Sequence, residues 1–151
     1  MAEVDDFLAS VMPRLIAADT ALHNGDAEPR IAIWSRNDPV TLFGAILMSN
    51  GWDGIEPVFR RLASQFGGSG TYEYEVVAAG ASGDLAYVAG FERTTASVGG
   101  GPPEAYSLRV TTVFRRENGE WKVVHRHADP VSSFASTSDQ VRRMGAALGS
   151  K

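Results

Sequence analysis

Two histidines near the C-terminal end of the chain are spaced for shared chemistry. His125 and His127 lie two residues apart in Trp121–Ala128, a stretch with the composition of a β-strand. Because residues i and i+2 of a strand point to one face, we expect both imidazoles on one side of a sheet, together with Trp121 and Val123. Imidazoles in this arrangement serve as general acid and base. The structural alternative is packing against helices or a partner subunit.

Glu92 and Arg109 add a carboxylate and a guanidinium group to the candidate catalytic residues. Glu92 lies in the middle of a predicted strand, where a carboxylate is disfavoured unless it is exposed or partnered. Facing inward, Glu92 would pair with Arg109 or a histidine and act as a general base; at an exposed edge it would have no such role. Arg109 offers a carboxylate or phosphate ligand its fork of donors if it faces inward. The alternative for Arg109 is solvent or a dimer interface.

Aromatic residues and one aspartate are the candidates for a substrate-binding wall. Trp34 and Phe43 are predicted to line a pocket, with Trp52 and Tyr87 as further members. Aromatic side chains more often form plain core, but the two roles overlap in a domain that keeps a cavity. Asp38 precedes a proline after the second predicted helix, so capping of a loop competes with a binding role.

Neither a metal nor an organic cofactor is predicted. A metal centre at the two histidines would need a third ligand, for which Asp129 and Glu92 are the available carboxylates. The glycine run Gly99–Gly101 precedes two prolines rather than a helix, which does not fit a phosphate-binding loop.

The elements that would position these residues are three helices followed by four long strands. Apolar residues recur at helical spacing in Val4–Leu22, a shorter helix follows Asp26, and Asp53 with Glu56 predicts a capping box for a third helix. Between the second and third helices, Pro39–Leu47 is predicted to be a strand or an extended arm. The predicted strands are Thr71–Ala79, Leu85–Thr95, Glu104–Arg116 and Trp121–Ala128. This order predicts an α+β domain over residues 1–135, with residues 136–151 as a helical or frayed tail.

Bulk composition narrows the classes of function. A length of 151 residues suits one domain. The net charge of −4 gives no basic footprint for nucleic acid, and the absence of cysteine excludes disulfides and thiolate catalysis. No run approaches the ~20 apolar residues of a membrane span, and the acidic N-terminus is unlike a signal peptide. The sequence therefore predicts a soluble cytoplasmic protein.

Several segments together resemble a known family. The first helix ends in ALHNGD (residues 21–26), GWD (51–53) opens the third, and the sheet closes with FRRENGEWKVVHRH (114–127). The pattern resembles the SnoaL-like and ketosteroid-isomerase-like branch of the nuclear transport factor 2-like superfamily. The closing hairpin is similar to the calmodulin-dependent kinase association domain. The resemblance covers nearly the whole chain.

The resemblance implies a fold but no single activity. It implies a cone in which a strongly bent sheet wraps over the helices around an apolar pocket, often with dimers through the outer face of the sheet. Members isomerise steroids, cyclise polyketides, dehydrate small molecules, or only bind and assemble. The positions that align with the catalytic groups of ketosteroid isomerase hold Phe43, Ala18 and Thr112. None of these can do the corresponding work, which excludes steroid isomerisation by that mechanism.

Two functions remain. The first is a small-molecule pocket protein, a cofactor-independent isomerase, cyclase or dehydratase in which His125, His127 or Glu92 moves a proton and Arg109 or a tyrosine steadies an oxyanion. The second is a non-enzymatic binding or assembly module. The expected partners are a small apolar or carboxylate-bearing molecule and a second copy of the chain in a homodimer, with neither nucleic acid nor membrane.

Overall fold

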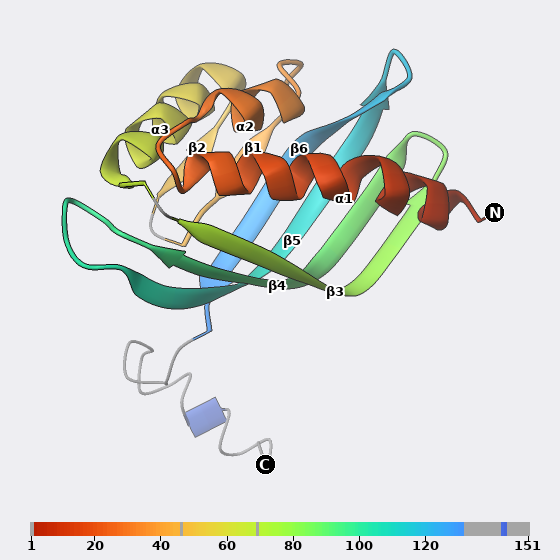
Figure 1. Ribbon diagram of the computed structural model, residues 1–151. Helices are drawn as coiled ribbons and strands as arrows, with labels where there is room; N and C mark the ends of the chain where they lie inside the picture. The colour runs from red at the N-terminus through yellow and green to blue at the C-terminus, as the bar shows by residue number, and fades with distance from the viewer. Residues whose placement is uncertain (1, 46, 69, 132–142, 145–151) are drawn as a thin grey trace.

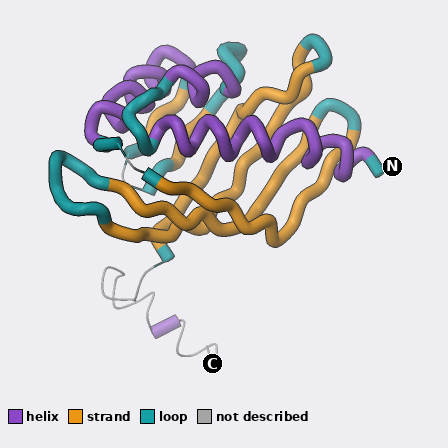
Figure 2. The backbone as a smooth tube through the Cα atoms, in the orientation of Figure 1, coloured by secondary structure: helices purple, strands orange, loops and turns teal. Residues whose placement is uncertain are grey.

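The computed structural model describes residues 2–45, 47–68, 70–131 and 143–144. Three helices, α1 (Glu3–Leu22), α2 (Glu28–Ile33) and α3 (Trp52–Gln65), pack on one face of a six-stranded sheet (Figure 2). The strands are β1 (Thr41–Phe43), β2 (Met48–Asn50), β3 (Thr71–Ser82), β4 (Leu85–Ala96), β5 (Glu104–Glu117) and β6 (Glu120–Pro130). The predicted α+β cone is confirmed. The predicted tail, apart from residues 143–144, lies outside the described residues.

The sheet has the order β2-β1-β6-β5-β4-β3 and is antiparallel except between β1 and β6. Its four long strands bend, and α1 crosses their inner face while α2 and α3 cover the end near β1 and β2 (Figure 1). The inner face of the sheet and the helices therefore enclose the interior of the cone. The long strands agree with the predicted ones to within a few residues, whereas β2 was not predicted.

Helix α1 forms because its apolar residues recur every three or four positions and so share one stripe. That stripe is buried against the sheet, where Phe7 packs edge-on to Phe114 and Trp121 at ring separations of 5.1 and 5.2 Å. Acidic residues in the first turn favour the positive end of the helix dipole. The helix ends before Gly25, which takes the left-handed conformation with φ 95°. Of the helices in the described ranges, none is long and apolar enough to cross a bilayer.

Helix α3 begins differently from the prediction. It starts at Trp52, and no side chain of the predicted capping box of Asp53 and Glu56 caps it. Instead, Asp38 reaches across from the preceding loop, and its Oδ1 accepts a hydrogen bond from the backbone N–H of Trp52 at 3.1 Å. A residue distant in sequence thus satisfies one of the free donors that every helix N-terminus presents.

A β-bulge in β6 decides which side chains enter the cone. Val113 pairs with His125 but the next residue of β5, Phe114, pairs with Val123, so that Val124 is an extra residue in β6. An extra residue reverses the alternation of faces from that point on. Trp121 and Val123 therefore point inward, and the histidines that follow point outward. The prediction that all four share one face was wrong for this reason.

Candidate functional site

A buried ion pair joins two strands on the inner face of the sheet. Glu92 of β4 and Arg126 of β6 are 2% and 8% exposed. The two nitrogens Nη1 and Nη2 of Arg126 each donate to one oxygen of Glu92 at 2.7 Å, and the hydroxyl of Tyr72 donates to Oε2 at 2.6 Å. Burial alone would raise the pKa of Glu92, but the charge and hydrogen bonds of Arg126 outweigh it and lower that pKa to about 2. Glu92 is therefore a fixed anion.

A second buried pair links α1 to α2. Arg30 donates to Oδ1 of Asp19 through Nε at 2.9 Å and also through Nη2. Both side chains are buried, and the Arg30 guanidinium lies over the ring of Phe59 at 5.2 Å. The other oxygen of Asp19, Oδ2, is buried and has no hydrogen-bond partner among the described residues. Because buried polar atoms are nearly always satisfied, Oδ2 of Asp19 is an acceptor available to a water molecule or a ligand.

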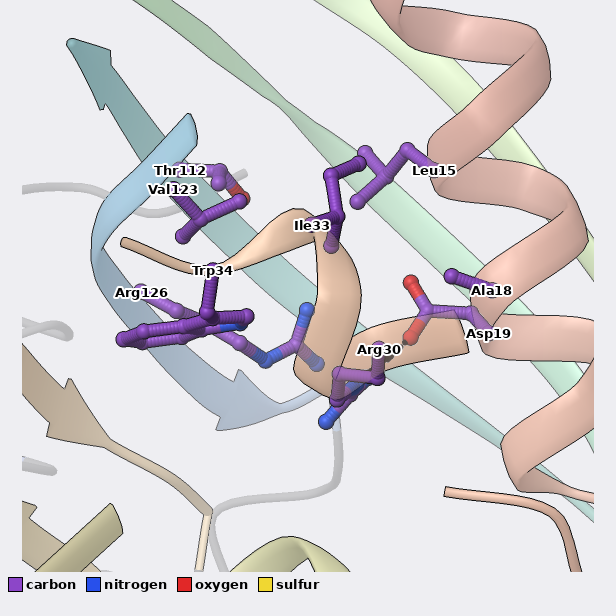
Figure 3. Close-up of a pocket in the computed structure, with 9 residues that line it drawn as sticks. All are labelled: Leu15, Ala18, Asp19, Arg30, Ile33, Trp34, Thr112, Val123 and Arg126. Carbon is purple, nitrogen blue, oxygen red and sulfur yellow. Dashed lines mark hydrogen bonds and ion pairs between the residues drawn. The ribbon is translucent and has the colours of Figure 1, made fainter. Parts of the chain in front are cut away.

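Three of these charged side chains line a cavity between α1, α2 and the sheet. Figure 3 shows Asp19, Arg30 and Arg126 approaching one space from three different elements. The cavity measures about 10 Å³, room for about one water molecule. The hydroxyl of Thr112 is a second buried polar atom without a partner in the part of the chain that the structure describes. The lining residues are Leu15, Ala18, Asp19, Arg30, Ile33, Trp34, Thr112, Val123 and Arg126.

His23 extends the polar interior from the end of α1. Its Nδ1 lies 2.7 Å from the carbonyl oxygen of Asp19, which only accepts, so Nδ1 carries the proton. The other nitrogen, Nε2, then accepts from the hydroxyl of Tyr106 at 2.6 Å. Burial lowers the pKa of His23 and favours the neutral ring. The ring also stacks on Tyr72 at 6.0 Å, which connects it to the Glu92 pair.

The structure separates the predicted catalytic residues. His125, His127 and Arg109 lie on the outer face of the sheet, with Arg109 62% exposed and paired to Asp129 at 3.3 Å. Glu92 is on the opposite face, so the four side chains do not converge. The inward alternative for Glu92 holds, but its partner is Arg126 rather than Arg109 or a histidine.

The outer histidines have neighbours of their own. Nδ1 of His125 lies 2.6 Å from the hydroxyl of Thr41, and Nε2 of His127 lies 3.5 Å from Asp129. Burial, and then the neighbouring His127, lower the pKa of His125. Within the described ranges, no three histidine or carboxylate side chains form a cluster of the kind that holds a metal ion.

The residues of the predicted binding wall are also divided between the interior and the outer face of the sheet. Trp34 is buried and lines the cavity. Phe43 does not: it pairs in register with His127, and so shares the outer face, 41% exposed. Tyr87 is 43% exposed on the outer side of β4. Trp52 lies in the core, and Asp38 is occupied in capping α3.

Sequence reasoning missed Asp19 and Arg126. Asp19 lies in the buried stripe of α1, three residues before Leu22, and a carboxylate on an apolar helix face is a signal that was available. Arg126 was missed because the bulge at Val124 reverses the alternation of inward and outward side chains just before it. Without that bulge, the residues on either side of Arg126 would have faced the interior.

Comparison of the sequence with known protein families gives a match over most of the chain. The profile of the SnoaL-like domain matches residues 12–133. The chain belongs to the SnoaL-like family. Of the three positions matched from sequence to the catalytic groups of ketosteroid isomerase, Ala18 and Thr112 line the cavity and Phe43 does not. A search of proteins with curated descriptions gives no significant match.

Solved structures agree on the fold. A proposed dehydratase of the nuclear transport factor 2-like family from Streptomyces avermitilis is 22% identical, with a TM-score of 0.69 over 85% of this chain and 99% of that one. A ketosteroid isomerase-like protein from Erwinia carotovora atroseptica is 23% identical, with a TM-score of 0.66 over 83% and 97%. A proposed calcium/calmodulin-dependent protein kinase II association domain from Xanthomonas campestris is 14% identical, with a TM-score of 0.65 over 84% and 87%. At these identities the likeness shows the fold alone.

Proposed function

We propose that this SnoaL-like domain binds a small molecule inside the cone and moves a proton on it without a cofactor, as an isomerase, cyclase or dehydratase does. The observation that carries the proposal is the buried free oxygen of Asp19 at a cavity also lined by Arg30, Arg126 and Thr112. A positioned carboxylate beside fixed hydrogen-bond donors is the arrangement that general base catalysis needs.

The chemistry follows from the positions of these groups. Oδ2 of Asp19 takes a proton from the carbon next to a carbonyl group, the C–H bond breaks, and its electron pair moves onto the carbonyl oxygen. The hydroxyl of Thr112 and the nearby arginine N–H groups stabilise that oxyanion. Returning the proton to another carbon gives isomerisation, carbon–carbon bond formation gives cyclisation, and loss of a β-hydroxyl as water gives dehydration.

Substrate entry requires the cavity to widen, since about 10 Å³ holds only about one water molecule. Entry between helix α2 and the sheet fits the lining of the cavity, because this short helix supplies Arg30, Ile33 and the adjoining Trp34 to one wall. Opening between helix and sheet would enlarge the space while Asp19 stays on the long helix α1. Closure afterwards excludes water from the reacting groups.

Deuterium exchange tests the proposal with simple ketones in place of the natural substrate, because all three reactions begin with removal of the same kind of proton. Hydroxyacetone and diacetone alcohol are incubated with the protein in deuterium oxide, and loss of the α-proton signal is followed by proton NMR. Asp19→Asn should slow exchange by about 10²–10⁴-fold. Asp129→Asn, the same change on the exposed outer face, is the matched control.

Thr112→Val supplies a variant that leaves both ion pairs intact, in case Asp19→Asn unfolds the domain. It should lower the exchange rate and leave the circular dichroism spectrum unchanged. Exchange no faster than in protein-free solution with every member of a wider ketone panel would contradict the proposal.

The second candidate function is homodimeric assembly, favoured by apolar side chains on the outer sheet face. Phe43, Val77 and Tyr87 are exposed there, and a hollow of about 410 Å³ lies among Val77, Phe91 and Arg109. Exposed apolar groups of this kind mark surfaces that bind other proteins. Light scattering of the wild type and of Val77→Asp tests this function: a dimer that the variant converts to monomer supports it, and a wild-type monomer at high concentration contradicts it.

A further inference from the structure

We propose that the interior site selects uncharged hydrogen-bond donors and rejects anions, and that Glu92 is the residue that sets this preference. The inference rests on the proposed function, because it names the class of molecule that the same cavity takes. It is carried by the charge balance and by the hydrogen-bonding capacity left over inside the cone.

The charges inside the cone cancel in pairs. Arg126 is matched by Glu92 through two hydrogen bonds of 2.7 Å, and Arg30 is matched by Asp19. His23, with its Nδ1 proton on the Asp19 carbonyl oxygen, adds no charge in its neutral form. A bound anion would therefore bring an uncompensated negative charge into a buried space, which is costly.

The free hydrogen-bonding groups point to the same class of ligand. Glu92 accepts from two of the five N–H groups of Arg126 and matches the positive charge of this arginine, so a carboxylate ligand would have to compete with Glu92 for that charge. Among the described residues, the buried atoms at the cavity without a partner are Oδ2 of Asp19, which accepts, and the hydroxyl of Thr112, which accepts or donates. A neutral group with an O–H or N–H satisfies Asp19, whereas a carboxylate oxygen would face it with like charge.

This assignment changes the ligand class expected from sequence. The carboxylate-bearing ligand was predicted from Arg109, whose side chain lies on the outer face and is paired there with Asp129. The arginines that do lie inside the cone are neutralised by carboxylates. Hydroxyl- or amide-bearing neutral molecules are the class that fits, and the hydroxyketones of the exchange assay belong to it.

Acetamide and acetate test the preference directly, since they have nearly the same shape and differ in charge. Each is titrated into wild-type protein carrying labelled methyl groups, and the signals of Ile33, Thr112 and Val123 report on the cavity. Acetamide should give saturable shifts of these signals and acetate should not. Saturable shifts with acetate at least as large would overturn the inference and leave the proposed pocket standing. No shifts with either probe would overturn both.

Glu92→Gln supplies a gain of function that a merely structural role would not give. Without the carboxylate, Arg126 is a buried cation lacking a counter-charge, and acetate should now bind about tenfold more tightly or better, as one charge-assisted hydrogen bond provides. Glu75→Gln is the matched control, because it removes a carboxylate from an exposed arginine pair. A folded Glu92→Gln variant with no gain in acetate affinity would overturn the role of Glu92. If the variant does not fold, the titrations of the wild-type protein with acetamide and acetate still test the preference for uncharged ligands.

Discussion

Neighbouring residues of β6 lie in two different environments. Arg126 is inside the cone, 8% exposed and held by two hydrogen bonds to Glu92, whereas His125 and His127 on either side of it lie on the outer face. On β5, Arg109 is likewise outside and 62% exposed, paired at 3.3 Å to Asp129. The same types of side chain thus form a fixed buried network on one face of the sheet and a loose, solvated set on the other.

The contrast shows that the type and spacing of residues say less about function than the face of the sheet on which their side chains lie. A buried charge is costly unless it is paired, so the inner groups must be held in one arrangement. Exposed ion pairs are screened by water and contribute little. The inner face therefore has the preorganised groups that catalysis and selective binding need, and the outer face has the exposed apolar groups that suit assembly.

The largest expected effect is the difference in stability between two arginine substitutions. Arg126→Met leaves Glu92 buried without its counter-charge and should lower the free energy of unfolding by about 3–5 kcal/mol. Arg109→Met on the outer face should change it by about 0–1 kcal/mol. Urea denaturation followed by tryptophan fluorescence measures both. Equal losses would mean that the two faces do not differ as described.

The sequence was sufficient to predict the fold but not the site. Helical spacing in α1 defines that helix locally, so it was predictable. The inward direction of Arg126 depends on one extra residue, Val124, and bulges leave no reliable mark in a single sequence. Phe43 was placed wrongly for a related reason, because its face follows from the pairing of β1 with a strand some eighty residues away.

A smaller effect is expected in the dependence of stability on pH. The unfolded chain binds a proton on His23 near the ordinary pKa of 6.5, while the buried ring in the folded protein binds it only at lower pH. The unfolded state therefore takes up more protons below pH 6.5, and the free energy of unfolding falls as the pH is lowered through that value.

His23→Gln should flatten this pH dependence. His125→Gln, on the outer face, should leave more of the slope, because the His125 ring is less buried and gives up less hydration. Thermal denaturation between pH 5 and 8 measures both slopes. If the slope vanished only in His125→Gln, the titrating group would be on the outer face, which would contradict the assignment to His23.

The smallest effect is expected for His127→Gln. The ring is exposed and its contact with Asp129 spans 3.5 Å, so the free energy of unfolding should change by no more than about 0.5 kcal/mol. Urea denaturation beside the wild type checks this. A loss comparable to that of Arg126→Met would show that the outer network is as tightly coupled as the inner one.

The rate of α-proton exchange in hydroxyacetone, measured side by side for two variants, tests most directly whether the working site lies inside the cone. With the site inside, Asp19→Asn should lose the protein-dependent exchange and His127→Gln should keep the wild-type rate. Loss of exchange in His127→Gln with full activity in Asp19→Asn would contradict an interior site and move it to the outer face of the sheet.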